Sequence, residues 1–268
     1  MATLTPPTGR SGVRESRTVH VAAPRHSWDL PPAPVPGGAP PRRVRRLLGV
    51  VGLLGLVLAL VALGLNLSLT SRLDRIDGAF DGLAARPAAA PGETILLVAT
   101  RPGGAADVPW LAGEQSIEGL MLVEIGANGA NVRVESLPLA AGIGAAVASS
   151  PPSSSVKAVE SWSGRRVDHL TAVDWRAFVQ LAAHNGVDTA YSYGSSASVQ
   201  HDYLREVLEG TLHAELRKQP LNLYRALITT ASGTAIDDEW SVLELDLLLL
   251  SLRNLRSQHI EFSNAQPR

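Results

Sequence analysis

Residues 47–70 form an apolar run of 24 residues without a charged side chain. At ~1.5 Å per residue, a helix of this length crosses the ~30 Å hydrocarbon core of a bilayer. Arginines stand at positions 42, 43, 45 and 46 directly before the run, whereas only Arg72 and Arg75 follow it closely. Because cationic flanks stay on the cytoplasmic side, the sequence predicts one membrane helix with a cytoplasmic N-terminus and an extracytoplasmic C-terminal domain.

A cleaved signal peptide is the alternative to a retained anchor. The apolar core of a signal peptide usually has about 7–15 residues and lies close to the N-terminus. The run in this chain is longer and starts at Leu47, and no small-x-small cleavage site follows it closely. A retained single-pass anchor in the cell membrane is therefore favoured.

The anchor divides the chain into four predicted segments. Residues 1–46 are rich in proline and arginine and predict a disordered cytoplasmic tail, because such a composition buries too little apolar surface to order itself. Residues 47–70 are the membrane helix. Residues 71–92 predict a stalk, whose first part extends the membrane helix before Pro87 ends it. Residues 93–268 predict one extracytoplasmic domain.

Charge follows the same division. The formal net charge is +6 over residues 1–46, zero over 47–92 and −7 over 93–268. An acidic domain without clustered Lys or Arg lacks the footprint that binds a phosphate backbone, so nucleic acid is excluded as a partner. The chain has no cysteine, which excludes disulfides, zinc–cysteine sites and thiol nucleophiles.

The periodicity of residues 93–268 predicts strands that alternate with helices. Continuous apolar runs predict buried strands at 94–100 and 120–125, and the Asn128-Gly129 turn precedes a half-buried strand at 131–137. The remaining predictions are a loop at 149–155, helices at 156–162, 175–184, 201–231 and 237–257, and strands at 167–173, 189–193 and 259–262. The fold class is therefore α/β or α+β, with a central mixed sheet in a three-layer domain. The leucine-rich helix at 237–257 is expected to be mostly buried.

Several strings, in their order behind one anchor, resemble the LytR-CpsA-Psr family. They are TILLVAT (94–100), IEGLMLVEI (117–125), VESLP (134–138), AVESWSGRRVDHLTAVDWRAFVQLAAHNGV (158–187), HDYLREVL (201–208) and AIDDEWSVLELDLLLLSLRNLRSQHIEF (235–262). The resemblance implies an extracytoplasmic phosphotransferase class that moves glycopolymers from a polyprenyl-pyrophosphate carrier to the cell wall. It also implies an apolar lipid channel between sheet and helices, arginines that hold pyrophosphate, and carboxylates that hold Mg²⁺.

The sequence departs from this family at its charged positions. Asp202 and Arg205 keep the first two positions of the D-x-x-R-x-x-R-Q motif, and Glu118 replaces a metal-binding aspartate. Other family positions hold residues of different chemistry, namely Arg101 for an aspartate, Leu139 and Ala140 for an Arg-Asp pair, and Leu208 and Glu209 for an Arg-Gln pair. Each lost forked contact costs ~1.5–3 kcal/mol of phosphate binding. The resemblance therefore implies a degenerate catalytic site.

Four residues are candidates for what remains of that site. Arg205 and Asp202 are the catalytic candidates, and the alternative is an i,i+3 helix pair worth ~0.2–0.5 kcal/mol. Arg101 and Arg205 are candidates for binding an anionic substrate, although an arginine on a surface loop is the favoured interpretation of Arg101. Glu118 is a candidate metal ligand, and otherwise an acid at the start of a strand. No cofactor is expected unless the protein is active, in which case Mg²⁺ is.

Three functions are compatible with this sequence. The favoured one is a membrane-anchored LytR-CpsA-Psr-like protein of cell-envelope glycopolymer assembly. It would bind polyprenyl-phosphate lipids, lipid-linked glycans or partner enzymes of the envelope without catalysis. The second is an active phosphotransferase with a rearranged site. The third is a structural partner of an intact family member. The arrangement of Arg101, Glu118 and Arg205 discriminates, because an active site requires them to converge.

Overall fold

The computed structural model describes residues 56, 57, 60, 64–103, 107–140, 142–184, 186–187, 191–212, 228, 230–252 and 255–267. The chain divides into two compact units, Met1–Gly55 and Leu56–Arg268, and only the second contains described residues. The expected cytoplasmic tail and most of the expected membrane helix thus lie outside the described residues. Within the described residues, no helix combines the length and the apolar character that a membrane span requires.

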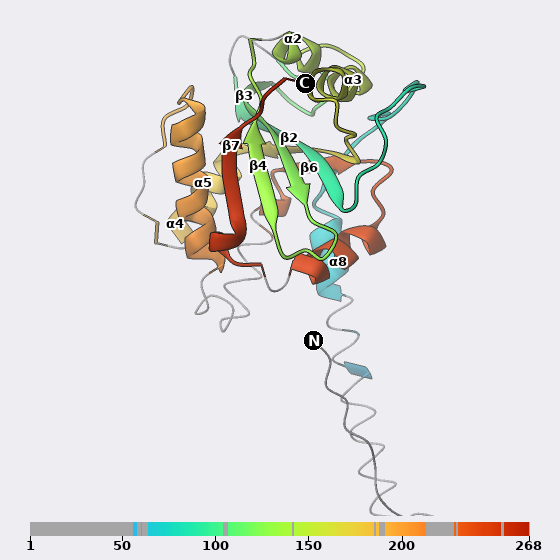
Figure 1. Ribbon diagram of the computed structural model, residues 1–268. Helices are drawn as coiled ribbons and strands as arrows, with labels where there is room; N and C mark the ends of the chain where they lie inside the picture. Colours follow the sequence, from blue (N-terminus) through green and yellow to red (C-terminus); the bar gives the residue numbers. More distant parts are fainter. Residues whose placement is uncertain are drawn as a thin grey trace, which may run out of the picture. The chain divides into compact units, whose positions relative to one another are not determined.

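A mixed seven-stranded sheet in the order β1-β6-β5-β2-β3-β4-β7 forms the centre of the second unit (Figure 1). The α/β class with a mixed sheet that the sequence predicts is confirmed. The antiparallel pairs are β2–β3, β3–β4 and β5–β6, and the parallel pairs are β1–β6, β2–β5 and β4–β7. The strands are β1 (Asp74–Ile76), β2 (Glu93–Pro102), β3 (Gln115–Ile125), β4 (Val132–Ser136), β5 (His169–Asp174), β6 (Thr234–Asp237) and β7 (Ile260–Asn264).

Alternation along β2 fills both faces of the sheet. Leu96 and Val98 point into one apolar core, and Ile95 and Ala99 point into the other. Successive side chains of a strand point to opposite faces, so a strand covered on both sides has a continuous apolar sequence. This is why the run at 94–100 predicts the central strand correctly.

Helices cover both faces and complete three layers. The first core packs against α2 (Ile143–Val147) and α3 (Ser153–Ser163). The second core packs against α4 (Trp175–His184), α5 (Ala197–Leu212) and α8 (Val242–Ser251). Figure 1 shows α2 and α3 together at one end of the sheet, away from α4 and α5.

Two helix ends follow the expected capping chemistry. Helix α3 ends at Gly164, whose φ of 65° places it in the left-handed region that favours glycine. Asp174 precedes α4, and its Oδ1 accepts a 2.9 Å hydrogen bond from the backbone N–H of Arg176. The edge strand expected at 259–262 is β7, paired with β4.

The expected stalk is wrong in part. Residues 74–76 form β1, which pairs with β6 in the sheet, and Ile76, Ala79 and Phe80 are buried in the first core. The helix that precedes β1 ends at Thr70. Short apolar stretches between charged residues did not indicate a strand, because their burial depends on β6, 160 residues later in the chain.

The C-terminal helix is shorter and more exposed than expected. Residues 234–237 form β6, with Asp237 fully buried, and α8 begins only after Ser241. Ser241 and Glu244 form a reciprocal capping box, and this sets the start of the helix. The expectation that its leucines are mostly buried is wrong, because one face of α8 is exposed.

Two other elements differ from the prediction. Residues 191–193 were expected in a strand and form a loop between α4 and α5. The loop expected at 149–155 ends early, since α3 starts at Ser153, and the short helix α2 precedes it. Most of residues 213–231, which were expected to be helical, lie outside the described part.

Candidate functional site

An irregularity in the pairing of β2 with β3 directs Glu118 out of the regular ladder. Ala99 pairs with Gly119, but the next residue, Thr100, pairs with Ile117, so Glu118 is the extra residue of a β-bulge. A bulge redirects one side chain and is frequent beside functional sites. The Glu118 side chain is 1% exposed and lies beside the loop between α4 and α5.

Protein donors hold the Glu118 carboxylate. Its Oε1 accepts hydrogen bonds from the hydroxyl of Tyr191 at 2.5 Å and from the backbone N–H of Gly194 at 2.8 Å. Its Oε2 lies 3.5 Å from Nε of Arg101, an ion pair without hydrogen-bond geometry. Arg101 is 32% exposed, and its guanidinium lies 5.7 Å from the ring centroid of Tyr193. The structure therefore brings two of the four predicted site residues together.

An aromatic cluster packs around the tyrosine that donates to this carboxylate. The ring of Tyr191 lies 4.8 Å from that of Trp175 and 5.0 Å from that of Tyr203. Burial, and then the hydrogen bond to Glu118, raise the pKa of Tyr191, so its hydroxyl stays a donor. Because the phenol remains protonated and points at the carboxylate, the pair acts as a fixed anchor for the α4–α5 loop.

Helix α5 is tied to the same bulge. The amide of Gln200 donates to the backbone oxygen of Glu118 at 3.1 Å. Gly119 leaves room for this contact, since a Cβ at position 119 would lie 2.9 Å from Oε1 of Gln200. Hydrogen bonds therefore join the bulge, the described part of the loop and α5 around Glu118.

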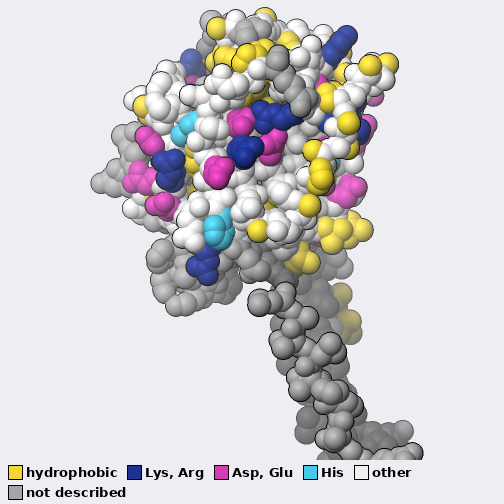
Figure 2. All heavy atoms as spheres, in the orientation of Figure 1, with side chains coloured by type: hydrophobic (Ala, Val, Ile, Leu, Met, Phe, Trp, Pro, Cys, Tyr) yellow, Lys and Arg dark blue, Asp and Glu magenta, His cyan; other side chains and the backbone are white. Residues whose placement is uncertain are grey.

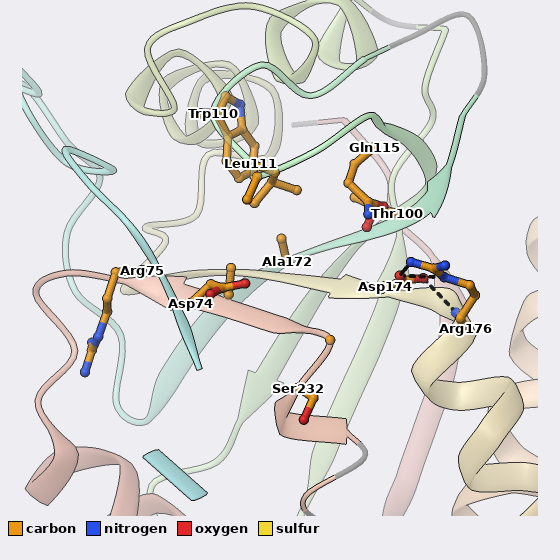
Figure 3. A pocket seen from close by; sticks show the side chains of 13 residues that line it. Asp74, Arg75, Thr100, Trp110, Leu111, Gln115, Ala172, Asp174, Arg176 and Ser232 are labelled. Carbon is orange, nitrogen blue, oxygen red and sulfur yellow. Dashed lines mark hydrogen bonds and ion pairs between the residues drawn. The ribbon is translucent and has the colours of Figure 1, made fainter. Parts of the chain in front are cut away.

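A cavity of about 290 Å³ opens beside the carboxyl ends of β2 and β5 (Figure 3). Trp110 and Leu111 form one wall, and Thr100 and Gln115 lie to one side of them. Asp174 and Arg176 lie at the start of α4, and Asp74 and Arg75 belong to β1. Arg176 donates to Oδ2 of Asp174 from both Nε and Nη2, at 2.8 and 2.5 Å. The cavity thus joins an apolar wall to a polar edge. Of the two arginines among its described residues, Arg176 is paired with Asp174, and Arg75 donates to the backbone oxygens of Asp237 and Trp240.

Arg205 and Asp202 lie on α5 and pair with each other. Nη1 of Arg205 donates to Oδ1 of Asp202 at 2.9 Å, and both side chains are exposed. The guanidinium of Arg205 lies 5.2 Å from the ring centroid of Phe262 on β7, at the edge of the sheet. In the described part of the chain, no hydrogen bond or ion pair joins Arg205 to Arg101 or Glu118. The three residues do not converge.

The residues present do not fit the Mg²⁺ that the resemblance implies. Hard cations require several oxygen ligands at one point. One oxygen of Glu118 already accepts two hydrogen bonds and the other faces Arg101. The described ranges hold no group of three carboxylate or histidine side chains that would bind a metal ion.

Comparisons with known proteins find similar solved structures but no match by sequence. No family model matches the chain, and no curated protein matches it. Protein gbs0355 from Streptococcus agalactiae is similar in structure at a TM-score of 0.50 and 15% identity, covering 66% of this chain and 77% of that chain. The LytR-Csp2A-Psr enzyme from Actinomyces oris is similar at 0.48 and 16%, over 71% and 86% of the two chains. TagV from B. subtilis is similar at 0.43 and 13%, over 65% and 84%.

These likenesses concern the fold alone. The described domain shares its fold with protein gbs0355 from Streptococcus agalactiae, and the solved structures similar to it include a protein titled as a LytR-Csp2A-Psr enzyme.

Sequence reasoning missed the partners of the predicted residues. Tyr191 was expected in a strand, and Asp174 was identified only as a helix cap. The spacing of Asp174 and Arg176 around the start of α4 was a usable signal for their ion pair. The contact between Tyr191 and Glu118 spans 73 residues and has no local signature.

Proposed function

We propose that this protein is a membrane-anchored, LytR-CpsA-Psr-like component of cell-envelope glycopolymer assembly that binds polyprenyl-linked intermediates and does not transfer them. The observation that carries the proposal is the neutralisation of the arginines near the carboxyl ends of β2 and β5. Arg101 faces Glu118, and Arg176 is bonded to Asp174 through two nitrogens. A pyrophosphate would have to compete with both carboxylates.

Phosphoryl transfer depends on positively charged groups that are free to stabilise charge in the transition state. Removing one such group typically costs ~2.7–4 kcal/mol of barrier, about 10²–10³ in rate. The family positions that lack charge, Leu139, Ala140 and Leu208, add to this loss. The geometry therefore favours binding over turnover.

The cavity beside this edge suits the polar end of a lipid carrier. Its volume of about 290 Å³ is close to the lower end of the ~300–1,000 Å³ range of small-molecule sites. Trp110 and Leu111 offer an apolar wall for the first isoprene units, and Thr100 and Gln115 offer polar groups for the headgroup. Because Arg176 is held by Asp174 and Arg75 by the backbone oxygens of Asp237 and Trp240, binding should depend little on whether the lipid carries one phosphate or two.

The test uses the full-length chain in detergent with Mg²⁺ and measures lipid retention and phosphate release together. We expect polyprenyl monophosphate and pyrophosphate to be retained with affinities within about threefold of each other, without release of phosphate. Trp110→Ala should weaken retention. Arg205→Ala should not, because Arg205 is exposed on α5 and does not line the cavity. Release of phosphate that Arg101→Ala abolishes would establish the active phosphotransferase instead. If neither lipid is retained, the remaining function is that of a structural partner of an intact family member.

A further inference from the structure

Helix α8 carries two opposite apolar faces. Leu245, Leu248 and Leu252 pack against the second core. Leu243, Leu247 and Leu250 lie on the other side and are 68, 56 and 55% exposed. At 3.6 residues per turn, positions 243, 247 and 250 share one face. The described surface around α8 is visible at the lower end of the domain, where hydrophobic side chains gather (Figure 2).

The acidic residues of α8 lie off this exposed stripe and are engaged. Glu244 accepts hydrogen bonds from the backbone N–H and the hydroxyl of Ser241, at 3.0 and 2.7 Å. Asp246 accepts a 2.7 Å hydrogen bond from Nδ2 of Asn66. The leucine stripe is therefore flanked by polar groups and is itself uninterrupted.

The bond from Asn66 to Asp246 fixes the height of α8 relative to the apolar run. Asn66 stands four residues before the end of the uncharged run at Thr70, a rise of about 6 Å in a helix. Interfacial helices bury their apolar face about 5–10 Å into the boundary between headgroups and acyl chains. The distance from the end of the run thus matches the depth that such a helix requires.

We propose that α8 is a second membrane contact, with Leu243, Leu247 and Leu250 inserted into the outer leaflet of the bilayer that holds residues 47–70. The inference rests on the predicted anchor but not on lipid-linked substrates. Anchor and α8 together would fix the orientation of the domain on the membrane, which a single span followed by a flexible segment would not do. Exposed Leu65 and Leu67 continue the apolar surface on the helix next to α8.

The chain has no cysteine, so single-cysteine labelling of the full-length protein is unambiguous. Nitroxide labels would be placed at Leu247→Cys, Leu60→Cys and Val199→Cys in separate proteins reconstituted into liposomes of anionic and zwitterionic lipid. Val199 is the matched control, since it is 48% exposed on α5. Accessibility to oxygen and to a water-soluble nickel chelate is then measured for each label.

We expect the label at position 247 to be about tenfold less accessible to the nickel chelate than the label at 199, and more accessible to oxygen. Equal nickel accessibility at 247 and 199, with the label at 60 in lipid, would overturn the inference while leaving the anchor intact. An aqueous label at 60 would overturn the anchor itself. Spin–spin coupling at 247 that disappears on dilution with unlabelled protein would show a second copy on this face, and would also overturn it.

Discussion

Nε of Arg101 lies 3.5 Å from Oε2 of Glu118, and this contact turns two predicted site residues into a neutral pair. The sequence suggested an anion-binding arginine and a metal-binding carboxylate at these positions. The structure gives each of them the other as a partner, because the bulge in β3 directs Glu118 toward Arg101. The pairing of Arg101 with an internal carboxylate is therefore the central physical feature of the candidate site.

The Glu118→Gln variant tests whether this pairing limits anion binding. The amide oxygen still accepts from Tyr191 and Gly194, but the negative charge that competes for Arg101 is gone. We expect inorganic pyrophosphate to bind the full-length variant about threefold to tenfold more tightly than the wild type, a modest gain because Arg101 is partly exposed to solvent. Isothermal titration calorimetry measures the change.

Glu135→Gln is the control for that experiment. Glu135 pairs with Arg165 in a separate charged network over β3 and β4, where acidic and basic side chains are interspersed in Figure 2. Its neutralisation should leave pyrophosphate binding unchanged. Equal effects of the two variants would mean that general electrostatics, and not the Arg101 pair, limits binding.

Tyr191→Phe should destabilise the domain by about 1–3 kcal/mol, because it removes a hydrogen bond from a buried carboxylate. The matched control is Tyr203→Phe in the same aromatic cluster. The buried hydroxyl of Tyr203 has no hydrogen-bond partner among the residues that the structure describes, so its removal should be neutral or slightly stabilising. Urea denaturation followed by tryptophan fluorescence measures both. A smaller effect for Tyr191→Phe than for Tyr203→Phe would contradict the anchoring role of Glu118.

Arg86→Ala tests whether residues before Glu93 belong to the folded domain. Nη2 of Arg86 lies 2.8 Å from Oε1 of Glu160, and the two side chains are 16 and 5% exposed. Leaving Glu160 buried without its partner should cost about 3–5 kcal/mol, whereas Arg133→Ala, in an exposed pair, should cost less than about 1 kcal/mol. Comparable unfolding midpoints for the two variants would instead support the prediction that residues before Glu93 form a stalk outside the folded domain.

His201 should make stability depend on pH. Its Nε2 lies 2.7 Å from Oγ of Ser136, and burial, followed by the charge of Arg205, lowers its pKa in the folded state. The unfolded chain therefore takes up a proton first as pH falls, so this contribution to stability is present above pH ~6.5 and is lost below it. The free energy of unfolding should decrease from pH 7.5 to 5.5 by more in the wild type than in His201→Gln. Parallel pH profiles of the two proteins would exclude His201 as the cause of the pH dependence of stability.

Local patterns predicted the parts of this fold that local physics determines. The buried runs of β2 and β3, the turn at Asn128-Gly129 and the end of α3 at Gly164 all follow from residue types at short spacing. The position of β1 does not, since its partner β6 lies about 160 residues away. The same dependence on distant residues explains why the site was predicted only in part. Arg101 and Glu118 were identified from their places in the sequence, but their pairing depends on a bulge that no local pattern shows.

The measurement that tests the central claim most directly is phosphate release from polyprenyl pyrophosphate by the full-length protein with Mg²⁺. Retention of the lipid with release no faster than in protein-free samples is the result that the neutralised arginines predict. Release above that background, abolished by Arg101→Ala and unaffected by Arg205→Ala, would contradict the account and show that this edge of the sheet is an active site.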